Sequence, residues 1–127
     1  LTSRRKPVKP TSFIVNVTSE DPDRLKKFYA DVVGLPPNPN IGEGAFEIMP
    51  GSSFIIDGHS EVKGPTKEPA RVLTSFFVDD LKAEQARLKE KGVKFIREEG
   101  KEYWGGVIST FLDPDGNYIQ IIEYKPE

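Results

Sequence analysis

Apolar residues in the first half of the chain follow the period of a strand and then that of a helix. Residues 13–18 are rich in β-branched and aromatic side chains, which is typical of a strand. The apolar residues after them recur three or four positions apart, as on one face of a helix: Leu25, Phe28, Val32 and Leu35. Asp21 is expected to cap this helix and Gly34 to end it. Three short strands are predicted next, at 41–43, 45–49 and 53–57.

The same order of elements is predicted a second time. Residues 71–78 have the composition of a strand, and Asp79 or Asp80 is expected to cap a helix that Gly92 ends. Three strands are predicted after it, at 93–97, 107–112 and 118–124. The chain is therefore predicted to be an α+β protein with two tandem βαβββ units, at about 11–60 and 70–125, within a single domain of residues 11–127.

Length and composition restrict the class of protein. A chain of 127 residues with 36% hydrophobic residues can bury one core. The absence of cysteine excludes disulfides, thiolate nucleophiles and Cys-type zinc sites. No apolar run approaches the ~18 residues of a membrane span, and no apolar signal segment is visible near residue 1. We therefore expect a cytoplasmic protein without membrane contact.

Charge is concentrated at the start of the chain. Residues 1–10 hold four basic residues and no acid, and since the whole chain carries −2, the remaining residues carry −6. A basic tail can contact nucleic acid, but the acidic body favours a solvated, disordered leader over residues 1–10. No nucleic-acid partner is predicted.

The segment 111–123 carries the clearest motif. Asp113, Pro114 and Gly116 have the turn preferences that join two strands in a hairpin. As a string, FLDPDGNYIQIIE resembles the last hairpin of the glyoxalase/bleomycin-resistance/extradiol-dioxygenase superfamily, which has the vicinal oxygen chelate fold. Residues 21–35 and 78–81 resemble its first helix and the start of its second. The resemblance implies a curved mixed sheet around a cup, formed within one chain or across a dimer.

The resemblance also implies where a metal ion would be bound. Metalloenzymes of this superfamily place one ligand on each of four strands, and the corresponding positions here are Ile14, Ile55, Leu73 and Gln120. Three of these side chains have no lone pair, and a neutral amide is a weak ligand for divalent ions. Residues one position away offer no metal-binding set either. Neither a metal ion nor another cofactor is predicted.

Without a metal ion, the same strands predict a pocket. Alternation along them gives a mostly apolar wall with a few polar groups, a composition common in small-molecule sites. Loop 98–106 places two aromatic residues between glycines, where they can stack on a flat or cationic ligand, and its acidic residues favour a basic one. The alternatives are that the cup is filled by its own side chains and that Trp104 plugs one end of the sheet. The predicted ligand-binding residues are Ile14, Asn16, Ile55, Leu73, Ser75, Phe77, Tyr103, Trp104, Gln120 and Ile122.

No arrangement of residues predicts a catalytic group. The single histidine, His59, lies beside Asp57 and Glu61 in a polar connector, where an ordinary surface histidine is the favoured interpretation over a ligand or general base. The pair Asp113 and Asp115 is explained by the turn.

The function that the sequence favours is a metal-free protein that binds or sequesters a small apolar or aromatic molecule in a cup. The bleomycin-resistance proteins that it resembles act in this way, as dimers with clefts at the subunit interface, so a homodimer is expected. One alternative is a glyoxalase- or dioxygenase-like lyase, oxidoreductase or isomerase. Such an enzyme would have its metal ligands at positions other than those assigned above, or would use His59, Asp57 or Tyr103 as acid or base. The other is a non-catalytic protein interaction module.

Overall fold

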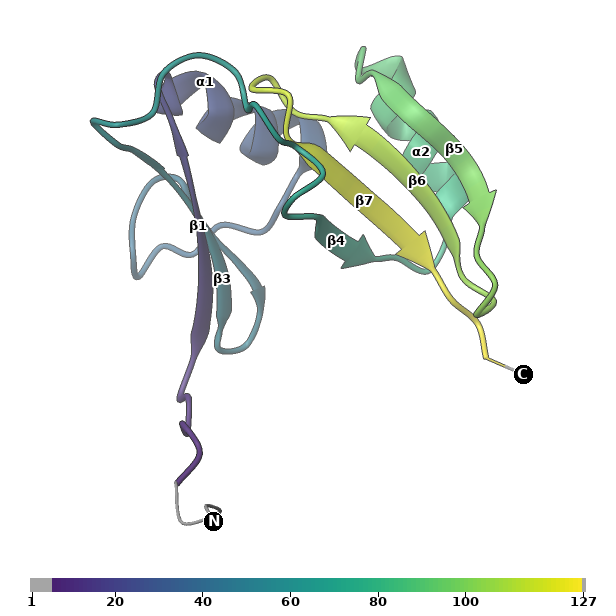
Figure 1. Cartoon of the computed structure of the whole chain (residues 1–127), viewed down its shortest axis with the longest axis horizontal. Coiled ribbons are helices and arrows are strands. Elements are labelled where there is room, and N and C mark those ends of the chain that lie inside the picture. Colours follow the sequence, from purple (N-terminus) through teal and green to yellow (C-terminus); the bar gives the residue numbers. More distant parts are fainter. Residues whose placement is uncertain (1–5, 127) are drawn as a thin grey trace.

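The structure, a computed structural model, describes residues 6–126 and is built on two β-sheets (Figure 1). The first sheet contains β1 (Phe13–Ser19), β2 (Ala45–Met49) and β3 (Ser52–Gly58), in the order β1-β3-β2. The second contains β4 (Thr74–Phe77), β5 (Phe95–Lys101), β6 (Val107–Leu112) and β7 (Tyr118–Glu123), in the order β4-β7-β6-β5. In each sheet the first and last strands pair in parallel and the other pairs are antiparallel. The predicted α+β class with mixed sheets is confirmed.

The helix of the first unit begins where its cap was predicted. The Asp21 carboxylate accepts a hydrogen bond from the Arg24 N–H at 3.3 Å, and α1 (Pro22–Lys27) follows. The helix then widens into a π-helix, η1 (Phe28–Val33), which ends at Gly34 with φ of 81°. Leu25 and Tyr29 are fully buried on the apolar face. The caps and the apolar spacing therefore located the helix, although not its change of winding.

The helix of the second unit also fastens the two units together. The Asp80 carboxylate accepts from the Ala83 N–H at 3.1 Å and caps α2 (Leu81–Glu90). The Arg87 guanidinium donates to the carbonyl oxygens of Val32 and Val33 at 3.0 and 2.9 Å. These carbonyls lie at the end of η1, where backbone acceptors have no helical partner. The Arg87 guanidinium on α2 thus supplies the hydrogen-bond donors that the end of the first unit's helix lacks.

Three predicted boundaries were wrong. Residues 41–43 form a turn instead of a strand, because the Asn38 carbonyl accepts from the N–H groups of Ile41 and Gly42 at 3.2 and 3.3 Å. The first unit accordingly has three strands in the described residues, with one bridge between Pro37 and Phe46 in place of a fourth. Residues 71–73 precede β4, and the predicted loop 98–106 contributes its first residues to β5, whose bulges break the expected alternation.

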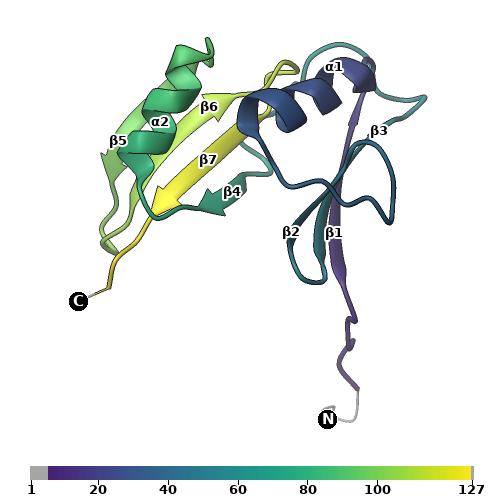
Figure 2. The same ribbon diagram turned by 180° about the vertical axis from the view of Figure 1, so that it is seen from behind.

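The core lies between the helices and one face of each sheet. Figure 2 shows α2 lying across the second sheet, and α1 packs on the first. Aromatic side chains join the two parts, since the rings of Tyr29 and Phe54 are 4.9 Å apart and those of Phe54 and Phe76 are 6.3 Å apart. From this junction the two sheets diverge toward the bottom of Figures 1 and 2.

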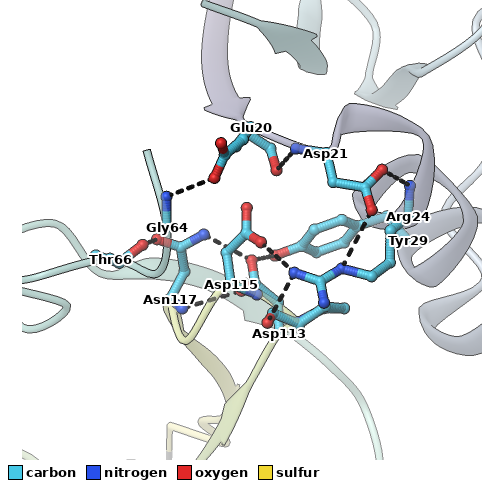
Figure 3. Close-up of polar contacts among 11 residues, drawn as sticks. Glu20, Asp21, Arg24, Tyr29, Gly64, Thr66, Asp113, Asp115 and Asn117 are labelled. Atoms are coloured by element: carbon cyan, nitrogen blue, oxygen red, sulfur yellow. Dashed lines mark hydrogen bonds and ion pairs between the residues drawn. The ribbon is translucent and has the colours of Figure 1, made fainter. Parts of the chain in front are cut away.

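The turn after β6 is the centre of a buried polar network (Figure 3). Asp113 is 4% exposed, and one carboxylate oxygen accepts from the N–H groups of Asp115 and Asn117, both at 2.9 Å. The other accepts from the Tyr29 hydroxyl at 2.7 Å and the Asn117 side-chain amide at 2.8 Å. Asp115 accepts from the Arg24 guanidinium at 2.8 Å. The two aspartates therefore hold the turn and attach it to the first helix, as their turn assignment predicted.

Candidate functional site

Each sheet has one face that the helices cover and one that they do not, which we call the open face. Along β7, Ile119 and Ile121 belong to the buried core, so the alternating residues Gln120 and Ile122 point to the open face. Along β1, Val15 and Val17 pack on the core, and Ile14 and Asn16 are exposed on the other side. The structure thus has the predicted alternation of side chains between the two faces of β1 and β7.

A polar row crosses the open face of the second sheet. Ser75 pairs in register with Gln120, Gln120 with Thr110, and Thr110 with Arg97, so one polar residue comes from each of the four strands. The Ser75 hydroxyl donates to the Gln120 side-chain oxygen at 2.9 Å. Since Ser75 is engaged with the carbonyl end of the Gln120 amide, the NH₂ end remains a donor at the centre of the row.

An apolar row lies beside the polar one. Phe77 pairs with Ile122, Ile122 with Ile108, and Ile108 with Gly100. Phe77 is 67% exposed, whereas Ile122 and Ile108 are buried although no helix covers this face. Of this row, Phe77 is therefore the member whose apolar side chain is accessible to a ligand.

Two side chains of the β5–β6 hairpin lie over glycines. A Cβ atom at Gly100 would overlap the Arg97 guanidinium, and one at Gly106 would overlap the Trp104 ring. Arg97 also forms a 2.7 Å ion pair with Glu102, and the ring centroid of Trp104 is 5.5 Å from that of Tyr124. Because neither glycine has a side chain, the guanidinium and the indole can lie directly against the backbone.

Sequence reasoning missed Arg97, Thr110 and Glu102 on this face. The register of β5 shifts between Phe95 and Arg97 and again before Gly100, so simple alternation from Phe95 assigns the wrong face beyond the first bulge. The clue was Gly100 itself, because a glycine inside a strand often marks a bulge or a close approach. The expectation that local acids favour a basic ligand loses its support, since Glu98 pairs with Lys89 at 2.9 Å and Glu102 with Arg97.

The open face of the first sheet holds the other predicted residues. Asn16 pairs in register with Ile55, and its amide donates to the Asp57 carboxylate at 3.2 Å. Ile14 is 51% exposed at the start of β1. Both β1 and β4 lie at the end of their sheets, so one edge of each has no strand partner within residues 6–126.

The ten predicted ligand-binding residues fall into groups. Ser75, Phe77, Gln120 and Ile122 lie together on the second open face. Ile14, Asn16 and Ile55 share the first. Tyr103 is 99% exposed at the tip of the β5–β6 turn, next to Trp104, and Leu73 is exposed just before β4. That these residues contact a ligand stays a prediction. Five cavities of about 170 to 440 Å³ in the described chain are lined by other residues.

The positions that would hold a metal ion do not suit one. Ile14, Ile55, Leu73 and Gln120 present three hydrocarbon side chains and one amide, and the amide is already hydrogen-bonded to Ser75. Divalent ions in proteins require carboxylate, imidazole or thiolate donors in number. Within residues 6–126, no group of three or more His, Cys, Asp or Glu side chains is placed to hold an ion.

His59 is an exposed residue of the connector after β3. Its Nδ1 atom accepts a hydrogen bond from the Glu61 N–H at 3.1 Å, and its carbonyl accepts from the Val62 N–H at 3.1 Å. Asp57 is engaged with Asn16. The imidazole therefore closes a turn, and the geometry gives it no partner for acid or base chemistry among the described residues. Within residues 6–126, no helix has the length and apolar content needed to cross a membrane.

Comparison with known proteins gives one consistent family. A family model described as the Glyoxalase/Bleomycin resistance protein/Dioxygenase superfamily matches residues 13–121. The uncharacterized protein YurT of Bacillus subtilis (strain 168) is 32% identical over 124 residues, a match that covers 87% of this chain and 96% of that protein.

Solved structures share the fold at low sequence identity. A glyoxalase/dioxygenase from Nostoc punctiforme superposes with a TM-score of 0.72 at 17% identity, over 98% of this chain and 100% of that one. TnmS3, an antibiotic binding protein from Streptomyces sp. CB03234, gives a TM-score of 0.67 at 22% identity, over 95% and 100% of the two chains.

Proposed function

Because the chain belongs to the glyoxalase/bleomycin resistance protein/dioxygenase superfamily, we propose that it binds and sequesters a small, largely apolar or aromatic molecule on its open faces, without a metal ion. The observation that carries this proposal is the pair of rows on the second sheet, one apolar and one polar, in register across four strands. Binding sites for small molecules combine apolar surface with a few placed polar groups in this way.

The apolar row supplies the affinity. Burial of apolar surface contributes about 25 cal/mol per Å², and Phe77 is mostly accessible to a ligand. Trp104 and Tyr124 extend the aromatic surface at the end of the same sheet, where stacking adds to simple burial. An apolar or aromatic ligand is therefore favoured over a sugar or a phosphate ester.

The absence of suitable ligands at the metal positions favours binding without chemistry. Glyoxalase- or dioxygenase-type reactions in this superfamily depend on an ion that Ile14, Ile55 and Leu73 cannot hold. His59, the residue that could replace it as an acid or base, is occupied in an exposed turn. The similarity in fold to an antibiotic binding protein is in keeping with a sequestering role.

We further propose that the binding unit is a homodimer. The accessible surface of 8858 Å² exceeds the value of about 6,800 Å² that a compact monomer of 14.2 kDa has. Residues 6–12, which are all exposed ahead of β1, account for part of the excess. Exposed Ile14 and Leu73 and the unpaired edges of β1 and β4 are surfaces that a second copy would cover. A standard interface buries about 800 Å² per partner, which this surface can supply.

The test uses prodan, a neutral planar naphthalene dye whose emission shifts to the blue and rises in apolar surroundings. We expect a saturable rise on titration with the protein, with about one site per chain. Phe77→Ala should weaken binding about tenfold, because a buried aromatic contact is worth roughly 1.5 kcal/mol or more. Ile41→Ala, which shortens an apolar residue in the turn before β2 that is 54% exposed against 67% for Phe77, should leave binding unchanged.

Two results would contradict the proposal. One is a dye signal that does not saturate, and the other is equal binding by the wild type and Phe77→Ala. Mass spectrometry of a bound natural ligand after incubation distinguishes the classes of function, since a sequestering protein returns its ligand unchanged and an enzyme does not. If the face is filled and binds only another protein, no small aromatic probe should give a binding signal.

A further inference from the structure

An apolar cavity of about 170 Å³ lies between the two units, on the side of the second sheet that α2 covers. The first unit contributes Val33, at the end of η1, and Leu35, which follows the helix. The second unit contributes five apolar side chains, from β4 and the residue after it, from α2, and from β6 and β7: Phe76, Val78, Leu88, Phe111 and Ile121. Seven of the nine residues that line the cavity are therefore apolar.

The cavity has a buried floor and an accessible mouth. The floor consists of Leu88, Phe111 and Ile121, which are at most 4% exposed. The other lining residues, from both units, are half-buried and form the mouth. A small molecule can therefore enter from solvent between the two units and reach the floor.

The two charged residues at the cavity are already engaged with each other and with the backbone. The Arg87 Nε donates to the Glu84 carboxylate at 3.2 Å. The other two guanidinium nitrogens donate to the carbonyl oxygens of Val32 and Val33 at 3.0 and 2.9 Å. Each nitrogen of Arg87 thus has an acceptor, and its charge is balanced by Glu84. The cavity therefore favours an uncharged ligand without strong hydrogen-bonding groups.

We propose that this cavity is a second binding site, for a compact, uncharged apolar molecule of about the size of benzene. An apolar cavity of about 150 Å³ lined by Leu, Ile and Phe side chains stays free of water and binds benzene or xenon. The cavity between the units has a similar lining and a slightly larger volume. Ligand sites also occur preferentially where two parts of a protein meet. A molecule in this place contacts both units, so its binding stabilises the folded chain.

The second site is separate from the open face, although it uses the same strands. Phe76 pairs in register with Ile121, and Phe77 pairs with Ile122 beside them. Successive residues of a strand point to opposite faces, so the first pair lines the cavity and the second lies on the open face. Prodan is much larger than benzene and does not fit the cavity. The second site therefore does not depend on the proposed function of the open face.

Methyl NMR during titration with benzene tests the site. We expect saturable shifts for the methyl groups of Val33, Leu88 and Ile121, with Ile122 nearly unchanged, and a rise in Tm at saturation. Benzoate should bind at least about tenfold more weakly than benzene, because its carboxylate loses water in the cavity without gaining a donor.

Val78→Phe fills the cavity from β4 and should lower benzene affinity at least about tenfold, because the new ring takes the space of the ligand. Val72→Phe makes the same change at a residue that is 69% exposed and does not line the cavity, so it should leave benzene affinity within about twofold. Nuclear Overhauser contacts from benzene to the Leu88 and Ile121 methyl groups locate the ligand in the wild type. They keep the test decisive if Val78→Phe does not fold.

Three results would overturn the second site. They are the absence of any saturable shift in the wild type, Overhauser contacts to Ile122 in place of Ile121, and equal benzene affinity in the wild type and a folded Val78→Phe. Benzoate that binds as tightly as benzene would overturn the uncharged ligand class. None of these results affects the prodan titration of the open face.

Discussion

The Tyr29 hydroxyl donates a 2.7 Å hydrogen bond to the Asp113 carboxylate, across 84 residues of sequence. Tyr29 is on the helix of the first unit and Asp113 opens the last hairpin turn of the second, so this contact (Figure 3) joins the two units. Both side chains are buried, so loss of this hydrogen bond cannot be compensated by water and costs stability.

Tyr29→Phe tests this contact. It removes the hydroxyl and leaves one buried Asp113 oxygen with the Asn117 amide as its remaining donor. We expect the free energy of unfolding to fall by about 1–3 kcal/mol in urea denaturation, which is the usual cost of depriving a buried carboxylate of a donor. Tyr103→Phe, at a residue that is 99% exposed, is the control and should change stability by less than about 0.5 kcal/mol.

Alkaline pH should unfold the protein through the same residue. Burial, and then the adjacent Asp113 carboxylate, raise the pKa of Tyr29 far above its ordinary value of about 10. The stabilisation is complete below pH 10. It declines at higher pH, because the unfolded chain then loses a proton that the folded chain retains, with a slope of up to about 1.4 kcal/mol per pH unit. Urea denaturation at pH 9 and pH 11 measures this difference, which should be smaller in Tyr29→Phe. An equal decline in both proteins would contradict it.

The dimer is tested by charge on the first open face. Ile14→Asp places a carboxylate at a half-exposed apolar position of the edge strand β1 and should raise the dimer dissociation constant at least about tenfold. Ile41→Asp, in a similarly exposed turn residue, should leave it unchanged. Sedimentation velocity over a range of concentrations gives both values. A wild-type protein that remains monomeric at high concentration refutes the dimer, whatever the variants do.

Metal ions should have no effect on ligand binding. The aliphatic side chains Ile14, Ile55 and Leu73 cannot coordinate an ion, so neither chelator nor Ni²⁺, Zn²⁺, Fe²⁺ or Mn²⁺ is expected to change prodan affinity or raise Tm. Differential scanning calorimetry with one equivalent of each ion is sufficient. A specific, stoichiometric rise in Tm would indicate ligands outside these positions and would favour the enzyme alternative.

The sequence located most elements because local signals agreed with the fold. Asp21, Asp80 and Gly34 lie where the caps and the stop were predicted, since capping depends on the few residues around a helix end. Alternation located the open faces of β1 and β7 for the same reason. The change to a π-helix at Phe28 has no counterpart in an apolar spacing of three and four, and so was not visible.

What the sequence did not reveal depends on contacts between distant segments. The turn at 41–43 forms because Asn38 supplies the acceptor, whereas three residues of mixed polarity suit a strand equally well. Arg97 lies on the open face because the register of β5 shifts between Phe95 and Arg97, and only the pairing of β5 with β6 defines that shift. The position of Arg97, which depends on the ion pair with Glu102 and on the space above Gly100, is likewise defined only in the folded hairpin.

The most direct test of ligand binding on the open face is methyl NMR of the isoleucine residues during titration with prodan. Neighbouring residues of β7 provide the comparison, because Ile122 faces the open side and Ile119 faces the helices. The account predicts saturable shifts for Ile122 and Ile108, with Ile119 and Ile56 nearly unchanged. Shifts confined to Ile119 and Ile56, or the absence of any saturable shift, would contradict it.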